Sequence, residues 1–178
     1  GETLVRAIAG GVALDPAKVR ICAAGYMAVG DGQGGIVLES VVSRPFAVGA
    51  NDAYVAYATF DGAIAAADDG RVASVYYENA PAHEAFATNV SDITVGAGTN
   101  AVLSTVYRTT PDGTNTVWSS QTAKRSVLTG RILVKGTLTL ENVEVAAPVV
   151  LDGGVLAVGA GYDVTDSAPV EVSFASMP

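Results

Sequence analysis

The chain has very few of the side chains on which most catalytic and metal-binding sites depend. Its 178 residues include one cysteine, Cys22, and one histidine, His83. A single cysteine excludes an intramolecular disulfide, and the apolar sequence around it predicts a buried, unreactive thiol. Zinc sites need several cysteine or histidine ligands, so the composition also argues against a zinc centre. We therefore expect a fold that depends on neither oxidation nor zinc.

Charged residues are also scarce, and most of them are acidic. Asp, Glu, Lys and Arg make up 16% of the chain, against about 25% in an average protein. The formal net charge is −8. Because binding to a phosphate backbone relies on Lys and Arg, we expect no nucleic-acid partner. The low charge has two explanations: a composition rich in Ala and Gly, or surface that is covered by other subunits.

Long apolar runs and secretion signals are missing as well. No stretch of 18 apolar residues occurs, which excludes a membrane-spanning helix. No basic segment followed by an apolar one is visible, so we expect no signal peptide. The sequence therefore predicts no membrane partner.

The residues that a hydrolase would need are not arranged for catalysis. A serine nucleophile would have to use His83 as its base, since it is the only histidine. No Gly-x-Ser-x-Gly motif is present, and Ser40, Ser43 and Ser104 lie in patterns typical of strands. We predict an exposed loop position for His83 and no catalytic residues.

Two further patterns resemble binding motifs without matching them. Asp52, Asp61, Asp68 and Asp69 lie within a short stretch, but no Asp-x-Asp-x-Asp loop with a terminal Glu accompanies them, as a calcium loop requires. The glycine-rich residues 30–35 lack the Lys-Ser or Lys-Thr that follows a P-loop. We therefore predict a protein that is not an enzyme, with no cofactor and no metal-binding residues.

Five Asp-Gly pairs punctuate the chain, most of them between short runs of Val, Ala, Leu, Ile, Tyr and Thr. An Asp-Gly pair favours a tight hairpin, because both central residues of a type I′ turn need a positive φ. These turns account for five of the eleven aspartates, which leaves few carboxylates for chemistry. The pairs are Asp31-Gly32, Asp61-Gly62, Asp69-Gly70, Asp112-Gly113 and Asp152-Gly153.

The pattern predicts an all-β protein of roughly twelve to fourteen short strands, at the spacing of sandwiches and barrels. The expected architecture is an antiparallel β-sandwich or β-barrel with many short hairpins and at most one or two short helices. A phrase such as Thr94-Val95-Gly96-Ala97 recurs from Ala28, Ala47 and Ala157. Its intervals are unequal, so a β-helix is the less favoured interpretation.

We expect residues 1–178 to form a single β domain. Residues 79–90 lack a β pattern, and Pro81 suits a first helical turn, so a short helix or a long loop is predicted there. The same segment is the best place for a boundary, which would divide the chain near 79–91 into 1–78 and 92–178.

Aromatic residues offer one possible ligand surface. Tyr54, Tyr57, Tyr76 and Tyr77 are expected either to form one aromatic patch or to make ordinary cross-strand pairs, and the second is favoured. An exposed cleft with these residues or Trp118 would indicate a carbohydrate- or ligand-binding β-sandwich module.

Three segments of the chain resemble virion structural proteins of tailed bacteriophages, of the capsid decoration, head-fibre or tail-tube type. They are residues 71–77, 130–140 and 147–159, and decoration proteins often carry a segment similar to the last. The resemblance implies a small β domain that forms trimers or rings and clamps a shell or tube. It carries no functional residue over to this chain.

The favoured hypothesis is therefore a non-enzymatic structural protein of a virion, assembled in the host cytoplasm. Its expected partners are copies of itself, with a trimer favoured, and a protein lattice such as a capsid shell. The terminal segments 1–15 and 167–178 are candidate arms that add a strand to a neighbour. The alternatives are the carbohydrate- or ligand-binding module and a bacterial surface or adhesin domain.

Overall fold

The described part of the chain is built almost entirely of strands, with one short helix, which confirms the all-β prediction. The computed structural model describes residues 2–5, 26–30, 36–40, 43–51, 53–79, 84–109, 117–120, 123–159 and 172–174.

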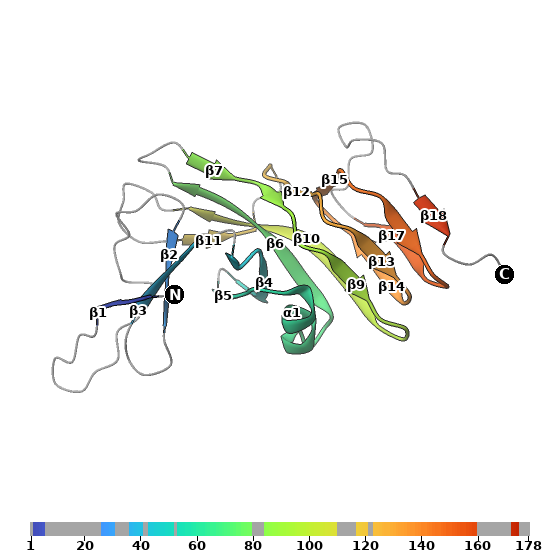
Figure 1. Ribbon diagram of the computed structural model, residues 1–178, viewed down its shortest axis with the longest axis horizontal. Helices are drawn as coiled ribbons and strands as arrows, with labels where there is room; N and C mark the ends of the chain where they lie inside the picture. Colours follow the sequence, from blue (N-terminus) through green and yellow to red (C-terminus); the bar gives the residue numbers. More distant parts are fainter. Residues whose placement is uncertain are drawn as a thin grey trace.

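The first five strands pair antiparallel. Three of them form a separate sheet in the order β1-β3-β2, which Figure 1 shows at the opposite end of the molecule from the C-terminus. The other two, β4 and β5, form a hairpin. The bounds are β1 (Glu2–Val5), β2 (Tyr26–Gly30), β3 (Ile36–Ser40), β4 (Phe46–Ala50) and β5 (Ala53–Tyr57).

From β6 onwards the chain winds into the coils of a parallel β-helix. It passes from β6 through β8 and β9 to β10, which lies beside β6, and it repeats this circuit through β14 to β17 (Figure 1). The coils stack through three parallel ladders, β6-β10-β14-β17, β8-β12-β15 and β9-β13-β16-β18. We call the first ladder the long sheet, because β4 and β5 extend it beyond β6.

Two short strands, β7 and β11, pair antiparallel with the ends of β6 and β10 and lie outside the coil circuit. The bounds of the strands in this part of the chain are β6 (Arg71–Asn79), β7 (Glu84–Phe86), β8 (Thr88–Asn89), β9 (Ile93–Val95), β10 (Asn100–Thr109), β11 (Val117–Ser119), β12 (Ser126–Leu128), β13 (Ile132–Val134), β14 (Thr137–Leu140), β15 (Val143–Val145), β16 (Val149–Leu151), β17 (Val155–Val158) and β18 (Val172–Phe174).

The core consists of inward-facing residues that stack from one coil to the next. Val72, Leu103 and Leu140 are neighbours in register on β6, β10 and β14, and each is at most 1% exposed. Burying such side chains stabilises the fold by about 25 cal/mol per Å² of apolar surface. Each coil thus depends on the coils beside it. The other stacks of buried residues are Ala101–Leu138, Ile93–Ile132–Val149, Val95–Val134 and Leu128–Val145.

The helix α1 (Phe60–Ala66) covers the first coil, where it packs against β4, β5, β6 and β9. Thr59 is its N-cap, and the Thr59 hydroxyl accepts a hydrogen bond from the Gly62 N–H at 3.1 Å. Phe60 and Ala63 are buried, and the Phe60 ring meets the Phe46 ring edge-on at 5.6 Å. The helix therefore shields this end of the core from water.

The Asp-Gly pairs serve several kinds of connection. Asp31-Gly32 and Asp112-Gly113 lie outside the described residues, but the strands on either side of each pair are antiparallel partners. Asp61-Gly62 lies in α1, Asp69-Gly70 leads from α1 into β6, and Asp152-Gly153 joins β16 and β17, which belong to different sheets. The prediction of hairpins at these last three pairs is wrong. The antiparallel sandwich or barrel is not confirmed, because the ladders of the coils are parallel.

The segment predicted as a short helix or long loop holds strands instead. Residues 80–83, with Pro81, lie outside the described part, but β7 pairs with β6 and β8 begins the second parallel ladder. β6 before the segment and β10 after it pair over eight residues. The long sheet thus runs across the position of the possible division near 79–91.

The described residues of both terminal segments pair within the chain. β1, inside residues 1–15, is antiparallel to β3, and β18, inside residues 167–178, is parallel to β16. This pairing inside the chain satisfies the backbone hydrogen-bonding groups along one edge of each of these strands. The remaining residues of the two candidate arms lie outside the described part.

Candidate binding site

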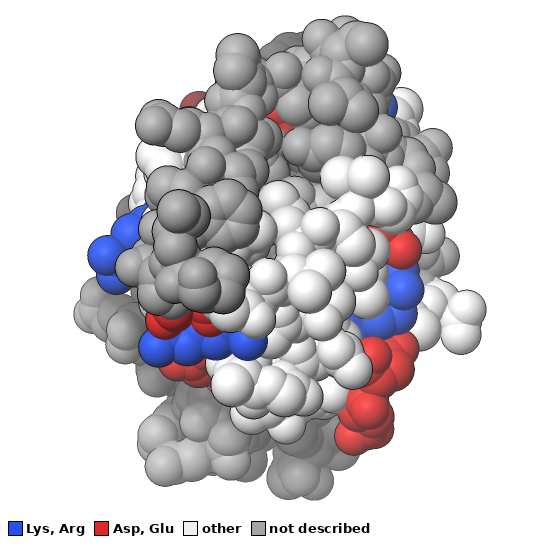
Figure 2. Space-filling model, turned by 90° about the vertical axis from the view of Figure 1, so that its right-hand side faces the viewer, with Lys and Arg blue, Asp and Glu red and all other residues white. Residues whose placement is uncertain are grey.

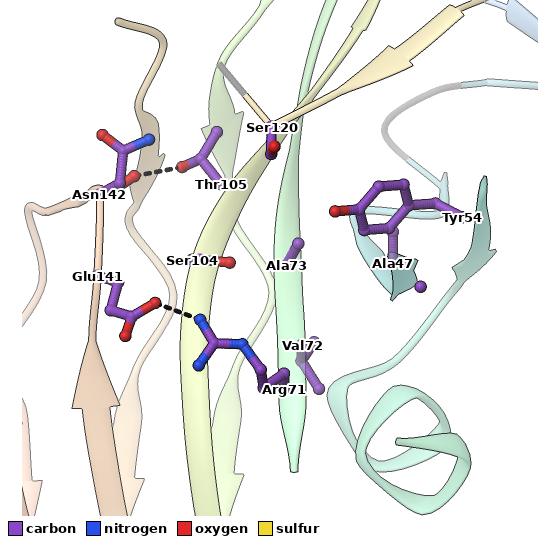
Figure 3. Close-up of a pocket in the computed structure, with 11 residues that line it drawn as sticks. Ala47, Tyr54, Arg71, Val72, Ala73, Ser104, Thr105, Ser120, Glu141 and Asn142 are labelled. Carbon is purple, nitrogen blue, oxygen red and sulfur yellow. Dashed lines mark hydrogen bonds and ion pairs between the residues drawn. The ribbon is translucent and has the colours of Figure 1, made fainter. Parts of the chain in front are cut away.

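A hollow of about 350 Å³ lies on the outer face of the long sheet, over β10, β6 and β4 (Figure 3). Ser104, Ala73 and Ala47 are neighbours in register on these three strands. Side chains alternate between the faces of a strand, so all three point to the same face. Because these side chains are small, the outer surface of the sheet is recessed where they lie. The volume of the hollow is at the lower end of the range for small-molecule sites.

The walls of the hollow come from separate parts of the chain. Arg71, the first residue of β6, forms an ion pair and hydrogen bond with Glu141, which follows β14 (Figure 3). Tyr54 lines the opposite side from β5, and Ser120 lines it just beyond β11. The backbone N–H of Arg71 donates to the Asp69 carboxylate at 2.9 Å, which orients the start of β6.

A layer of buried polar residues supports the hollow from inside the coil. The Asn89 amide donates to the Ser74 hydroxyl at 3.1 Å, and the Ser126 hydroxyl donates to the Ser74 carbonyl at 3.2 Å. The Thr105 hydroxyl donates to the Asn142 carbonyl at 2.6 Å and accepts from the Ser126 N–H at 2.9 Å. Hydrogen bonds of this kind compensate for the burial of polar groups. They also fix the relative positions of β6, β10 and β12.

Beyond the polar layer, an aromatic and charged cluster covers the inner face of the long strands. The Tyr76 and Tyr107 rings lie 5.9 Å apart, and the Lys124 ammonium is 5.2 Å from the centre of the Tyr76 ring. Lys124 also pairs with the Glu78 carboxylate at 3.1 Å. This hydrogen bond is the main reason that the pKa of Lys124 is raised.

A second cluster lies on the outer face of the same strands. The Arg108 guanidinium is 4.4 Å from the centre of the Trp118 ring, and the Tyr54 and Trp118 ring centres are 5.6 Å apart with the rings tilted by 37°. On the same side, the Tyr77 and Phe86 rings are 6.2 Å apart. Burial lowers the pKa of Arg108 to about 10. The cluster is largely buried and joins β11 and β7 to the long strands.

The four tyrosines of the predicted aromatic patch do not lie together. Tyr76 and Tyr77 point to opposite faces of β6, and Tyr57 packs against the coil core. Tyr76 pairs in register with Tyr107 across β6 and β10, which confirms the favoured cross-strand interpretation for this residue. Tyr54 is the one member of the four that lines the hollow.

The residues considered for hydrolytic chemistry are not brought together in the described structure. His83 lies outside the described residues, as does Cys22, whose thiol was predicted to be buried and unreactive. Ser43 donates its hydroxyl to the Ser40 carbonyl at 2.6 Å, an ordinary local contact at the end of β3. Ser104 is the only one of the three candidate serines that lines the hollow.

The aspartates considered for calcium serve the turns around α1. Asp61 lies in the first turn of α1, while Asp68 and Asp69 lie in the turn before β6. Asp52 lies outside the described residues. Within the part of the chain that the structure describes, no group of three His, Cys, Asp or Glu side chains could hold a metal ion.

Residues Asn89-Val90-Ser91 match the acceptor pattern for N-glycosylation, but the asparagine is buried. Asn89 is 2% exposed, and its side-chain oxygen accepts a hydrogen bond from the Ser91 N–H at 3.0 Å. Its side chain is therefore inaccessible to a glycosylating enzyme in the folded protein.

Within the described residues, no helix has the length and the hydropathy that a membrane-spanning helix requires.

The last coil leaves part of the core exposed. Val158 is in register with Leu140, so it faces the interior, but it is 62% exposed whereas Leu140 is 1% exposed. Among the described strands, β17 pairs with β14 alone. Figure 2 views the molecule from this end and shows a broad uncharged surface with charged residues at its margins. We call β17, the last described strand of the long sheet, the open coil end. Its Val155 is in register with Thr137 and is 56% exposed on the outer face, opposite to the inward-facing Val158.

Comparisons with known proteins give no information on the function of this chain. No protein-family model, no curated protein and no solved structure matches the chain.

The Arg71–Glu141 pair is the part of the site that sequence reasoning missed. The two residues are 70 positions apart, and only the parallel pairing of β6, β10 and β14 brings them together. The sequence offered only a weak indication of the pair. Arg71 is a charged residue at the start of β6, and Glu141 is one that directly follows β14. Without the register of the coils, nothing connects one with the other.

Proposed function

We propose that the chain is a non-enzymatic structural protein that assembles with copies of itself and onto a protein lattice such as a capsid shell, as a virion component. The observation that carries the proposal is the open coil end, where Val155 and Val158 are 56% and 62% exposed. The low content of charged residues and the resemblance of residues 71–77, 130–140 and 147–159 to phage virion proteins support it further.

A strand of another subunit fits the open coil end better than a small ligand does. None of the other described strands pairs with the outer edge of β17, and the natural partner of backbone groups at a sheet edge is another strand. The sequence of β17 is Val-Leu-Ala-Val, so the strand carries no charged side chain that would repel a second strand. At the other end of the coil, α1 and the β4–β5 hairpin already cover the core. Assembly through the C-terminal side is therefore the favoured mode.

Size-exclusion chromatography with light scattering tests the self-assembly. We expect an oligomer, a trimer on the basis of the resemblance, and a Val158→Lys variant that is monomeric, because the new charge would be buried without a partner. Val90→Lys is the matched control, since Val90 is 71% exposed and lies after β8, away from β17. Circular dichroism confirms that both variants fold. A wild-type protein that stays monomeric at every concentration would contradict the proposal.

The virion role has a separate test in the genome. A structural component of a tailed phage is expected to be encoded beside capsid, portal or head-protease genes. Neighbouring genes for metabolic enzymes alone would count against the virion role while leaving self-assembly intact.

A further inference from the structure

We propose that the hollow on the long sheet binds a neutral saccharide unit. The hollow is formed within a single chain, so this proposal does not depend on the self-assembly proposed above. It is supported by the shape of the hollow, by the chemistry of its lining and by the balance of its charges.

The shape suits a small cyclic ligand. The floor is formed by Ala47, Ala73 and Ser104, and no side chain there is large enough to fill the 350 Å³ above it. Tyr54 stands at one side of this floor and the Arg71–Glu141 pair at the other (Figure 3). A ring that enters the hollow would therefore lie between an aromatic side chain and a pair of polar groups.

The lining is unusually polar for a small-molecule site. Seven of the eleven lining residues have polar side chains, whereas such pockets are mostly apolar. The Thr105 hydroxyl and the Asn142 amide form hydrogen bonds within the protein, which leaves five polar side chains to meet a ligand: Tyr54, Arg71, Ser104, Ser120 and Glu141. A ligand with many hydroxyl groups is the chemical class that can use such a lining.

The Arg71–Glu141 pair fits two neighbouring hydroxyl groups in particular. A guanidinium can only donate hydrogen bonds, and a carboxylate can only accept them. A hydroxyl does both, so adjacent hydroxyls on a sugar ring can accept from Arg71 and donate to Glu141. The C–H groups on the face of the ring would then contact Tyr54.

The charges of the pair exclude selective binding of an ion. An anion attracted to Arg71 would be repelled by Glu141 beside it, and a cation attracted to Glu141 would be repelled by Arg71. The side chains of Arg71 and Glu141 are 49% and 23% exposed, so both remain accessible from the hollow. The preferred saccharide is therefore neutral rather than sialylated or built of uronic acids.

A glycan array of neutral and acidic oligosaccharides identifies the ligand, and isothermal titration calorimetry with the best neutral binder measures the affinity. We expect binding to neutral glycans and its loss in Ser104→Leu, because the leucine would fill the floor of the hollow. Thr94→Leu is the matched control, since Thr94 is an exposed hydroxyl residue on β9 and does not line the hollow. Circular dichroism establishes that both variants fold.

Glu141→Gln removes the charge while it keeps the shape of the side chain, and Arg71→Met removes the donor. Each is expected to weaken the affinity about tenfold, since hydrogen bonds to charged groups are the stronger ones. Failure of the wild type to bind any neutral glycan would overturn the proposal. So would a preference for acidic glycans, or equal affinities of the wild type and Ser104→Leu.

Discussion

At the scale of single residues, small side chains decide how closely the coils stack. Gly136 lies at the corner between β13 and β14, where a Cβ would fall well inside contact distance of the Thr99 and Gly96 carbonyl oxygens. At the neighbouring corner after β9, a Cβ on Gly96 would meet only the Thr99 hydroxyl, at 3.6 Å. Two glycines at similar corners thus have different roles, and only Gly136 is required by the packing of backbone on backbone.

Gly136→Ala is expected to destabilise the fold by about 1–3 kcal/mol, the usual cost of overpacking. Urea unfolding measures the change as a lower midpoint at an unchanged m-value. Gly96→Ala is the control and should stay close to the wild type. Equal stability of the two variants would show that the coils can separate without cost.

The Lys124–Glu78 pair makes the stability depend on pH. The pKa of Lys124 is raised on folding from its ordinary value of 10.5, chiefly by the hydrogen bond to Glu78. A base whose pKa rises on folding stabilises the fold while it is protonated in both states. That stabilisation is lost as the pH rises through the folded-state pKa.

The difference in unfolding free energy between the wild type and Lys124→Met should therefore be constant below about pH 10 and shrink above it. Denaturant titrations from neutral to alkaline pH measure this difference. Lys124→Arg is the control, because arginine keeps its charge over the same range. A difference that persists unchanged at alkaline pH would refute the role of the ammonium group.

At the scale of elements, α1 is held in place by its cap and by its buried face. The helix has only seven residues, and one this short is marginal without tertiary contacts. The Thr59 hydroxyl satisfies the Gly62 N–H, and Phe60 and Ala63 anchor the helix against the first coil. The same cap explains why Asp61-Gly62 belongs to a helix rather than to a hairpin.

Thr59→Ala should destabilise the protein by about 1 kcal/mol, because it leaves the Gly62 N–H without its side-chain acceptor. Thermal or urea unfolding measures the loss. Thr59→Ser keeps the hydroxyl and should restore most of the stability. If the serine variant is as unstable as the alanine variant, the threonine methyl group rather than the cap is responsible.

At the scale of the whole molecule, stability is distributed along the axis of the coils. A coil with neighbours on both sides is held more firmly than one at the end, since each contacts only the coils next to it. β10 and β14 have paired strands on both sides, whereas β17 is the last strand of the long sheet. The open coil end is therefore both the least stable part of the described coil and the surface proposed for assembly.

Hydrogen exchange tests this gradient. In dilute protein, the amides of β10 and β14 are expected to exchange slowest and those of β17 clearly faster. Raising the protein concentration should slow the exchange of β17 selectively if the open coil end is the assembly surface. Uniform protection along the coils at all concentrations would rule out the gradient.

The unequal lengths of the coils explain why the β-helix was not favoured from sequence. Thr137 pairs with Val155, 18 residues later (155 − 137), whereas Asn100 pairs with Thr137, 37 residues later (137 − 100). The longer coil includes the extended end of β10 and the added strand β11. A repeat interrupted in this way has no fixed period, so the recurring Ala-Val-Gly phrases did not reveal it.

The sequence by itself determined the β class, the absence of an intramolecular disulfide and the positions of most strands. These follow from local properties: β-branched and apolar runs, glycine-containing breaks and a single cysteine. Only the tertiary structure decided which strands are neighbours, in which direction they run and which residues face the hollow. The physical reason is that strand pairing is made by backbone groups common to all residues, so a local sequence specifies a strand without specifying its partner. The Arg71–Glu141 pair and the open coil end both arise from that non-local pairing.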